Sequence, residues 1–193
     1  RDGLEPERFA RAWQAVVNRH EVLRTSFHER RDGGFFQVVH RKVPLALREL
    51  DRRGADDAAL ELLAREERSA GFELARPPLM RLVLARLGEG SWRFIWTHHH
   101  VLMDGWSSAR VLDEVLRLYA GESLGPRPGS YRDYVEWLSR RDLAADERFW
   151  RTRLAAFSEP TSLASSLRRP GEASGRAEIE CCLSQAESEE LGG

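Results

Sequence analysis

The segment THHHVLMDGWS places three consecutive histidines, His98 to His100, ahead of Asp104 and Gly105. A neutral imidazole can accept a proton from an attacking amine, hydroxyl or thiol near neutral pH. If the segment were helical, Asp104 would lie beside His100 and orient it as the carboxylate of a catalytic triad does. Across a turn, the same carboxylate would point elsewhere and need a cation of its own. A polar cluster at a strand end, without catalysis, is the third interpretation.

A metal site is a weaker interpretation of these histidines. The side chains of His98 and His100 would share one face of a strand, but no second group of Cys, His, Asp or Glu stands at a recognisable ligand spacing. The only cysteines, Cys181 and Cys182, are adjacent and lack the CxxC spacing. We therefore expect no bound metal.

An upstream segment, RHEVLRTSF, offers the cation that Asp104 would need across a turn. Arg19 and Arg24 both lie in this short stretch. A buried arginine–aspartate pair forms charge-assisted hydrogen bonds, and such a pair would fix the turn that carries His100. In that arrangement Asp104 would be a structural residue rather than a catalytic one.

The segments around the histidines are predicted to form a β-hairpin. Residues 78–87 and 91–100 are apolar and of strand length, and a Gly-Glu-Gly connection separates them. Side chains alternate between the faces of a strand, so His98 and His100 would share a face with the aromatic residues of the second segment. His100 would then close the strand.

A turn followed by a helix is predicted after the hairpin. The apolar residues return to helical spacing after Ser107 and continue to about Gly121. Residues 101–106 therefore join strand to helix, and active-site residues often occupy such junctions.

The rest of the chain alternates helices with extended segments. We expect helices over 6–20, 57–69, 131–141 and 146–154, and extended segments over 35–40 and 43–50. Residues 158–175 are rich in Ser, Pro and Gly, which is typical of a linker. Residues 176–183 favour a strand and 184–193 the start of a helix. This mixture predicts an α/β (α+β) fold of two layers, with a mixed sheet flanked by helices.

Composition narrows the classes of function. The 193 residues are 41% hydrophobic and carry a net charge of -1, which gives no basic field for nucleic acid or an anionic membrane. No apolar run approaches the roughly 18 residues of a membrane span. Adjacent cysteines rarely form a disulfide, so a reducing cytoplasm is expected. The chain begins without methionine, which suggests part of a longer protein.

Three motifs in order resemble those of nonribosomal peptide synthetase condensation domains. HHxxxDG is present from His99 to Gly105, RHEVLRTSF resembles RHExLRTxF, and YRDYVEW, residues 131–137, resembles YxDFxxW. The resemblance extends from Gly3 to about Leu183 and is to the N-terminal lobe. It implies residues 1–175 as that lobe, and 176–193 as a strand and the start of the crossover into a C-terminal lobe.

The resemblance also implies a fold, partners and a reaction. The fold would be chloramphenicol-acetyltransferase-like, with two lobes and a tunnel between them. Upstream and downstream peptidyl carrier proteins would present a donor acyl or peptidyl thioester and an acceptor aminoacyl thioester on phosphopantetheine arms, and the acceptor amine would attack the donor carbonyl. An adenylation domain would be adjacent, and no cofactor would be bound directly.

Roles for individual residues follow from the same resemblance. His100 would deprotonate the amine or hold it in position, and His99 would support it. Gly105 would let the backbone approach the thioester closely, so that its N–H can polarise the carbonyl. Asp104 would be structural, paired with an arginine, and Arg24 is the expected partner.

Alternative functions stay open at this point. Acyltransferases that use coenzyme A or another carrier thioester share HHxxxDG, and a non-catalytic module that docks carrier proteins is the alternative outside the enzymes. Heterocyclisation domains replace the paired histidines with aspartates, so His99 and His100 argue against ring formation. The motifs of a second lobe are absent from the sequence, and we expect this polypeptide alone to make no amide bond.

Overall fold

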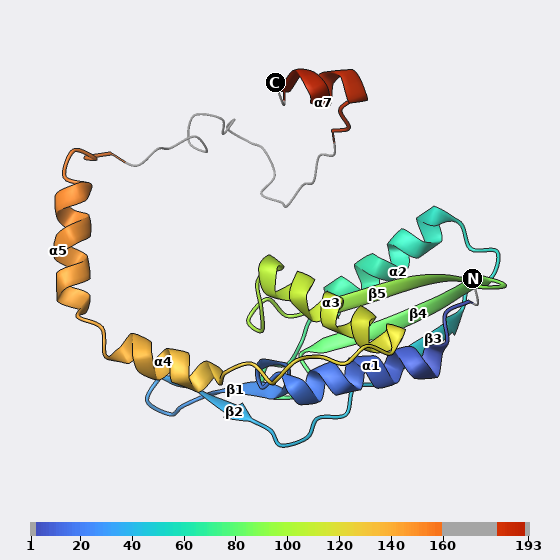
Figure 1. Cartoon of the computed structure of the whole chain (residues 1–193), viewed down its shortest axis with the longest axis horizontal. Coiled ribbons are helices and arrows are strands. Elements are labelled where there is room, and N and C mark those ends of the chain that lie inside the picture. The colour runs from blue at the N-terminus through green and yellow to red at the C-terminus, as the bar shows by residue number, and fades with distance from the viewer. Residues whose placement is uncertain (1–2, 160–180, 192–193) are drawn as a thin grey trace. The chain divides into compact units, whose positions relative to one another are not determined.

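A hairpin forms at the predicted position in the centre of the chain. In the computed structural model, which describes residues 3–159 and 181–191, β4 (Met80–Gly88) pairs antiparallel with β5 (Ser91–His98) (Figure 1). Gly90 in the connection has φ 66°, a backbone conformation that favours glycine. β5 ends at His98, so His100 lies in the following turn and does not close the strand as predicted.

A third strand makes the sheet mixed. β3 (Leu47–Asp51) pairs parallel with β4, giving the strand order β3-β4-β5. A parallel pair needs a crossover connection, which α2 (Asp57–Ser69) provides. The Asp56 side chain caps this helix by accepting a hydrogen bond of 2.8 Å from the Ala59 amide. The helix predicted over 57–69 is therefore confirmed.

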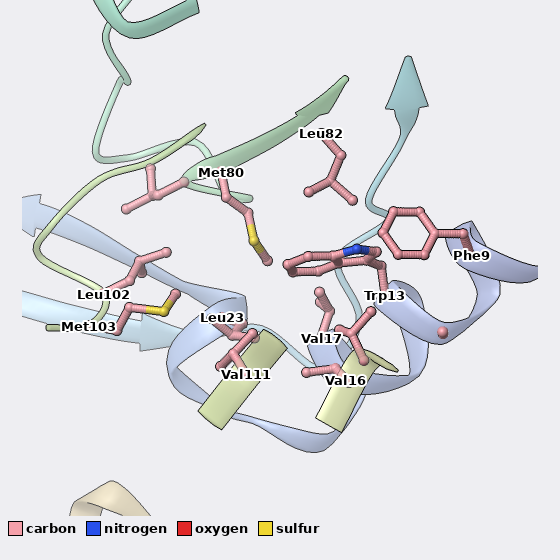
Figure 2. Close-up of a cluster of buried hydrophobic side chains, with 13 residues drawn as sticks. Phe9, Trp13, Val16, Val17, Leu23, Met80, Leu82, Leu102, Met103 and Val111 are labelled. Carbon is pink, nitrogen blue, oxygen red and sulfur yellow. The ribbon is translucent and has the colours of Figure 1, made fainter. Parts of the chain in front are cut away.

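Helices cover both faces of this sheet. α1 (Pro6–Arg19) and α3 (Gly105–Ala120) pack on one face around Trp13, which is 0% exposed and lies 4.8 Å from the Trp96 ring (Figure 2). Ile95, one residue earlier on β5, turns to the other face and contacts the cluster of α2. The mixed sheet flanked by helices is confirmed, and α2 covers the face that a two-layer arrangement would leave open.

Leu102 and Met103 belong to the main core although they lie in the turn after β5. They are 5% and 6% exposed and join the same cluster as Leu23 and Val111 (Figure 2). Burying an apolar side chain of this size contributes about 1.5–3 kcal/mol. The two apolar residues between His100 and Asp104 therefore anchor the turn to the core.

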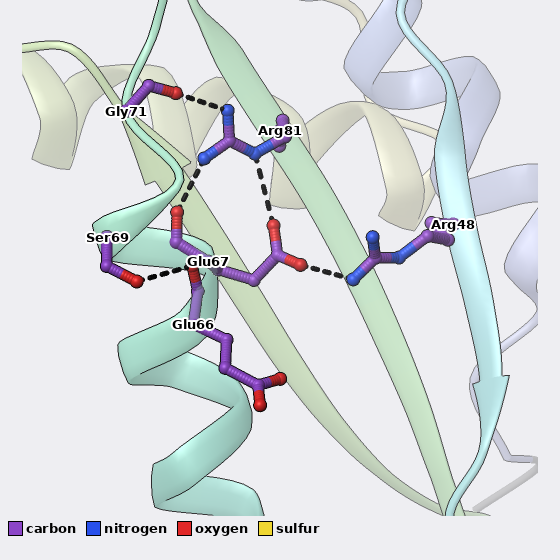
Figure 3. Close-up of polar contacts among 6 residues, drawn as sticks. All are labelled: Arg48, Glu66, Glu67, Ser69, Gly71 and Arg81. Carbon is purple, nitrogen blue, oxygen red and sulfur yellow. Dashed lines mark hydrogen bonds and ion pairs between the residues drawn. The ribbon is translucent and has the colours of Figure 1, made fainter.

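A polar cluster fastens α2 to the sheet. The Glu67 carboxylate, 7% exposed, accepts hydrogen bonds from Arg48 on β3 and from Arg81 on β4 (Figure 3). Arg81 also donates to the backbone carbonyls of Glu67 and Gly71. Glu67 thereby joins one helix to two strands.

A second, two-stranded sheet follows α1. After the 3-10 turn η1 (Val22–Arg24), β1 (Thr25–Glu29) pairs antiparallel with β2 (Phe35–Val39). The extended segment predicted over 35–40 is confirmed by β2. β1 had no prediction of its own, because its residues were interpreted only as part of a motif.

The chain divides into two compact units, 1–141 and 142–193. α4 (Tyr131–Ser139) closes the first unit, and the second contains α5 (Leu143–Arg153) and α7 (Gln185–Leu191). Each matches a predicted helix. Among the described residues, no helix is long and apolar enough to cross a membrane.

Two predictions fall wholly or partly outside the described residues. Residues 160–175 of the predicted linker lie there, and so do residues 176–180 of the predicted strand. The remainder of that strand, 181–183, has irregular backbone, and Cys181 and Cys182 are exposed and free. The domain boundary between 175 and 176 stays a prediction.

Candidate active site

The histidine turn is built by hydrogen bonds at its start. The His99 amide donates to the Leu79 carbonyl at 2.9 Å, which extends the pairing with β4 by one residue. Nδ1 of His99 accepts a hydrogen bond of 3.0 Å from the Val101 amide, so its proton is on Nε2 when the ring is neutral. The His99 side chain thus shapes the turn that presents His100.

His100 is exposed and lines a groove of about 1060 Å³ within the first unit. The other walls come from the end of α1, η1, β1, β2, the first half of α3, the loop before α4 and α4 itself. Asp104 and Arg24 line the same groove. Three of the five predicted site residues are therefore brought together, and His99 and Gly105 are their neighbours in the chain.

Asp104 caps α3. Its Oδ1 accepts a hydrogen bond of 2.8 Å from the Ser107 amide, which satisfies one of the free N–H groups of the first turn. The hydrogen bonds from Ser107 hold the pKa of the Asp104 carboxyl below its usual range, and the interaction with the nearby His100 adds to this effect. Asp104 is therefore the N-cap residue of α3.

The structure does not bring the predicted pair of Asp104 and Arg24 together, because the two side chains form no ion pair among residues 3–159 and 181–191. Arg24 is buried, and its Nη1 donates to the backbone carbonyl of His40, while its Nε has no partner in the described part of the chain. The turn needs no ion pair to fix it, because the burial of Leu102 and Met103 and the helix cap at Asp104 already stabilise it. Arg24 instead binds the chain just after β2.

His98 is a half-buried neighbour of the core. Its Nε2 lies 3.3 Å from Oγ of Ser108, and its Nδ1 is buried without a partner among the described residues. Burial lowers the pKa of His98, and the nearby His100 and His99 lower it further. The neutral imidazole is therefore favoured, and His98 is part of the packing rather than of the groove.

Gly105 begins α3 and does not need to be glycine for steric reasons. Its backbone is not left-handed, and a Cβ built there would meet no atom of the described chain within 4 Å. The space where a Cβ would stand is therefore open. That geometry is compatible with the close approach expected for Gly105.

Sequence reasoning missed a pair of residues in the groove. Nε2 of His20, just after α1, is 2.6 Å from Oε2 of Glu114 on α3, and Nε of Arg19 is 3.3 Å from the same oxygen. His20 belongs to the RHEVLRTSF segment, which resembles a motif of the family. Glu114 gave no signal, because a lone glutamate in an amphipathic helix is ordinarily solvated.

The groove also contains unpaired positive charge. Arg110 on α3 and Arg127 in the loop before α4 are exposed, and neither has an ion-pair or hydrogen-bond partner among residues 3–159 and 181–191. Two free guanidinium groups can bind an anion, because each presents several N–H donors. For a metal, the same described residues hold no group of three or more His, Cys, Asp or Glu in ligand positions.

A mixed sheet flanked by helices, with an exposed histidine turn beside a charged groove, is the architecture of a chloramphenicol-acetyltransferase-like lobe. Comparisons with known proteins lead to the same class. Residues 1–191 match the family model described as Condensation domain. A linear gramicidin synthase protein from Brevibacillus parabrevis is 40% identical over 164 residues, which are 80% of this chain and 2% of that protein.

Solved structures extend this likeness to the fold. The cyclization-docking bidomain of EpoB from Sorangium cellulosum is 31% identical, with a TM-score of 0.66, and the match covers 86% of this chain and 35% of that one. A crystal structure of a double mutant of the starter condensation domain of the rhizomide synthetase RzmA gives 25% identity and a TM-score of 0.72, covering 86% of this chain and 43% of that one. The chain belongs to the condensation-domain family of nonribosomal peptide synthetases, and it spans less than half of these solved chains.

Proposed function

We propose that this chain is the lobe of a condensation domain that carries the reacting histidine, and that the complete domain joins a donor acyl or peptidyl thioester to an acceptor amine. The observation that carries the proposal is the position of His100, exposed on an anchored turn and facing a groove of about 1060 Å³. The acceptor amine attacks the donor carbonyl, an amide bond forms, and the thiol of the donor arm leaves.

Each residue of the turn has a part in this reaction. His100 takes a proton from the attacking amine or holds the amine by a hydrogen bond. His99 fixes the turn through the Val101 amide. The N–H of Gly105 polarises the thioester carbonyl in this proposal, and the open space where a Cβ would stand supports a close approach of the backbone to the substrate. Family members that form heterocycles carry aspartates in place of His99 and His100, so we propose amide formation.

The proposed partners are those of a synthetase module. Upstream and downstream carrier proteins deliver the substrates on phosphopantetheine arms, the C-terminal lobe completes the tunnel, and an adenylation domain loads the acceptor. No cofactor is bound directly, and the reaction takes place in the cytoplasm. The presence of Arg110 and Arg127 in the groove supports the proposal that the arms bind there. Each arm carries a phosphate, which these free guanidinium groups can bind.

The experiment replaces His100 in the complete synthetase that contains this chain, with both carriers loaded and the peptide product measured by mass spectrometry. His100→Ala is expected to slow amide formation by roughly 10²-fold or more, the range of general acid–base catalysis. His100→Asn keeps a hydrogen-bonding group without the basicity, so its activity separates positioning from proton transfer. Undiminished turnover in His100→Ala would remove this residue from the reaction.

The matched control is His99→Ala, which removes the neighbouring imidazole and leaves His100. It is expected to lose less activity than His100→Ala, because His99 acts through the turn. The isolated chain, which spans only part of the domain, is expected to form no amide bond with the same loaded carriers.

A further inference from the structure

The proposed chemistry uses neither His20 nor its neighbours in the RHEVLRTSF segment. Yet His20 lies in the wall of the groove that His100 lines. Nε2 of His20 is 2.6 Å from Oε2 of Glu114, and the two side chains are 20% and 16% exposed. A carboxylate that accepts Nε2–H fixes the tautomer of a histidine and leaves the lone pair on Nδ1. The pair is therefore arranged as an oriented base.

The second ring nitrogen of His20 is available to a ligand. Among the described residues Nδ1 has no hydrogen-bond partner, and unlike Nδ1 of His98 it is not buried. An α-amino group ordinarily titrates near pH ~8, so much of an acceptor would enter the groove as ammonium. Ammonium nitrogen has no lone pair and cannot attack a carbonyl. A base is needed before His100 can act.

We propose that His20, oriented by Glu114, removes the first proton from the acceptor ammonium in the groove. This inference rests on the proposed function. One proton passes from the ammonium nitrogen to Nδ1 of His20, and the nitrogen keeps the electron pair. As the C–N bond forms and the C–S bond breaks, the second proton of the amine reaches the leaving thiolate beside His100. The His20 imidazolium then releases its proton to solvent.

Several other charged and titratable groups line the same groove as His20. Arg19 also contacts the Glu114 carboxylate, so removing Glu114 would leave His20 next to a guanidinium group that has lost its acidic partner. The tyrosines of α4 line the groove as well, and the remaining charged or titratable groups are Glu21, Arg24, His100, Asp104, Arg110 and Arg127. Of these groups, only Glu114 is joined to His20 by a hydrogen bond in the described chain.

The test is the pH dependence of single-turnover amide formation in the complete synthetase, with loaded carriers. His20→Asn is expected to be roughly tenfold slower than the parent near pH 7, where much of the acceptor is ammonium, and to approach the parent at alkaline pH, where the acceptor is already neutral. Glu114→Gln should show the same change to a smaller extent. Asp113→Asn is the matched control, because Asp113 neighbours Glu114 on α3 but is exposed and lies outside the groove. Its profile should follow the parent.

A second acceptor separates catalysis from folding. An aminooxy thioester is weakly basic and neutral over this whole pH range, so His20→Asn should use it as fast as the parent does. Equal slowing at every pH with both acceptors would mean a structural role and overturn the inference, and so would a profile identical to the parent. His100→Ala should be slow with both acceptors. If it is not, the proposed function fails, whereas an unchanged His20→Asn profile alone overturns only this inference.

Discussion

The Ser107 amide donates a hydrogen bond of 2.8 Å to Oδ1 of Asp104. This bond places the carboxylate at the start of α3, where it satisfies a free N–H group and interacts favourably with the helix dipole. The aspartate of the HHxxxDG motif thereby connects the turn of His100 to a helix whose apolar face lies in the core. Hydrogen bonds at both ends of the turn fix its backbone, and the buried side chains of Leu102 and Met103 between them anchor it to the core.

The capping role predicts how Asp104 responds to substitution. Asp104→Ala removes the acceptor for the Ser107 amide and should lower the melting temperature by about 2–4 °C. Asp104→Asn should leave it nearly unchanged, because asparagine caps helices equally well. Thermal unfolding followed by circular dichroism measures both. Asp56→Ala, which removes the equivalent cap of α2, is the matched control and should cost a similar amount. A large loss in Asp104→Asn would speak for an ionic role.

Arg24 is predicted to stabilise the fold independently of Asp104. Arg24→Ala leaves the His40 carbonyl without its donor and should lower the free energy of unfolding by about 1–3 kcal/mol, measured in urea. Because the two side chains form no ion pair in the described chain, the effects of Arg24→Ala and Asp104→Asn should be additive in the double variant. Strong coupling between them would restore the arginine–aspartate pair that the sequence suggested.

Local periodicity predicted most of the fold and the position of the site. The hairpin, α2 and the helix after the histidine turn follow from apolar spacing and from glycine at the connections. The partners of individual charges do not follow, because they depend on contacts between distant segments. Arg24 binds the carbonyl of His40 instead of Asp104, and His20 pairs with Glu114, which is 94 residues away. The parallel pairing of β3 with β4 is of the same kind.

The Glu67 cluster gives a prediction whose control is the preceding residue, Glu66. Glu67→Gln removes the charge that Arg48 and Arg81 share and should lower the free energy of unfolding by about 2–3 kcal/mol. The neighbouring Glu66 side chain is exposed and points away from both arginines, so Glu66→Gln should change it by less than about 0.5 kcal/mol (Figure 3). Equal effects in urea titrations of the two variants would contradict a specific bridge.

His98 should make the fold less stable as the pH falls. Burial lowers its pKa in the folded protein, so between that pKa and the unfolded value near ~6.5 the unfolded chain binds more protons. Its contribution to stability is complete above pH ~6.5 and is lost as the pH falls through the lowered pKa. The urea midpoint should therefore fall less in His98→Gln than in the parent when the pH is lowered from about 7.5 to 5. Parallel curves for the two proteins would exclude this residue as a source of acid lability.

The free arginines of the groove predict a preference for phosphorylated ligands. 4′-Phosphopantetheine should bind this chain roughly tenfold more tightly than pantetheine at low salt, because Arg110 and Arg127 have no other partner in the described chain and can each donate to the phosphate. Titration calorimetry or NMR shifts measure both affinities. Arg110→Gln and Arg127→Gln should each reduce the preference, and salt should weaken it by screening. Arg132→Gln is the matched control, since Arg132 is exposed on α4 but does not line the groove. Equal binding of the two compounds by the parent would show that the groove does not recognise the phosphate.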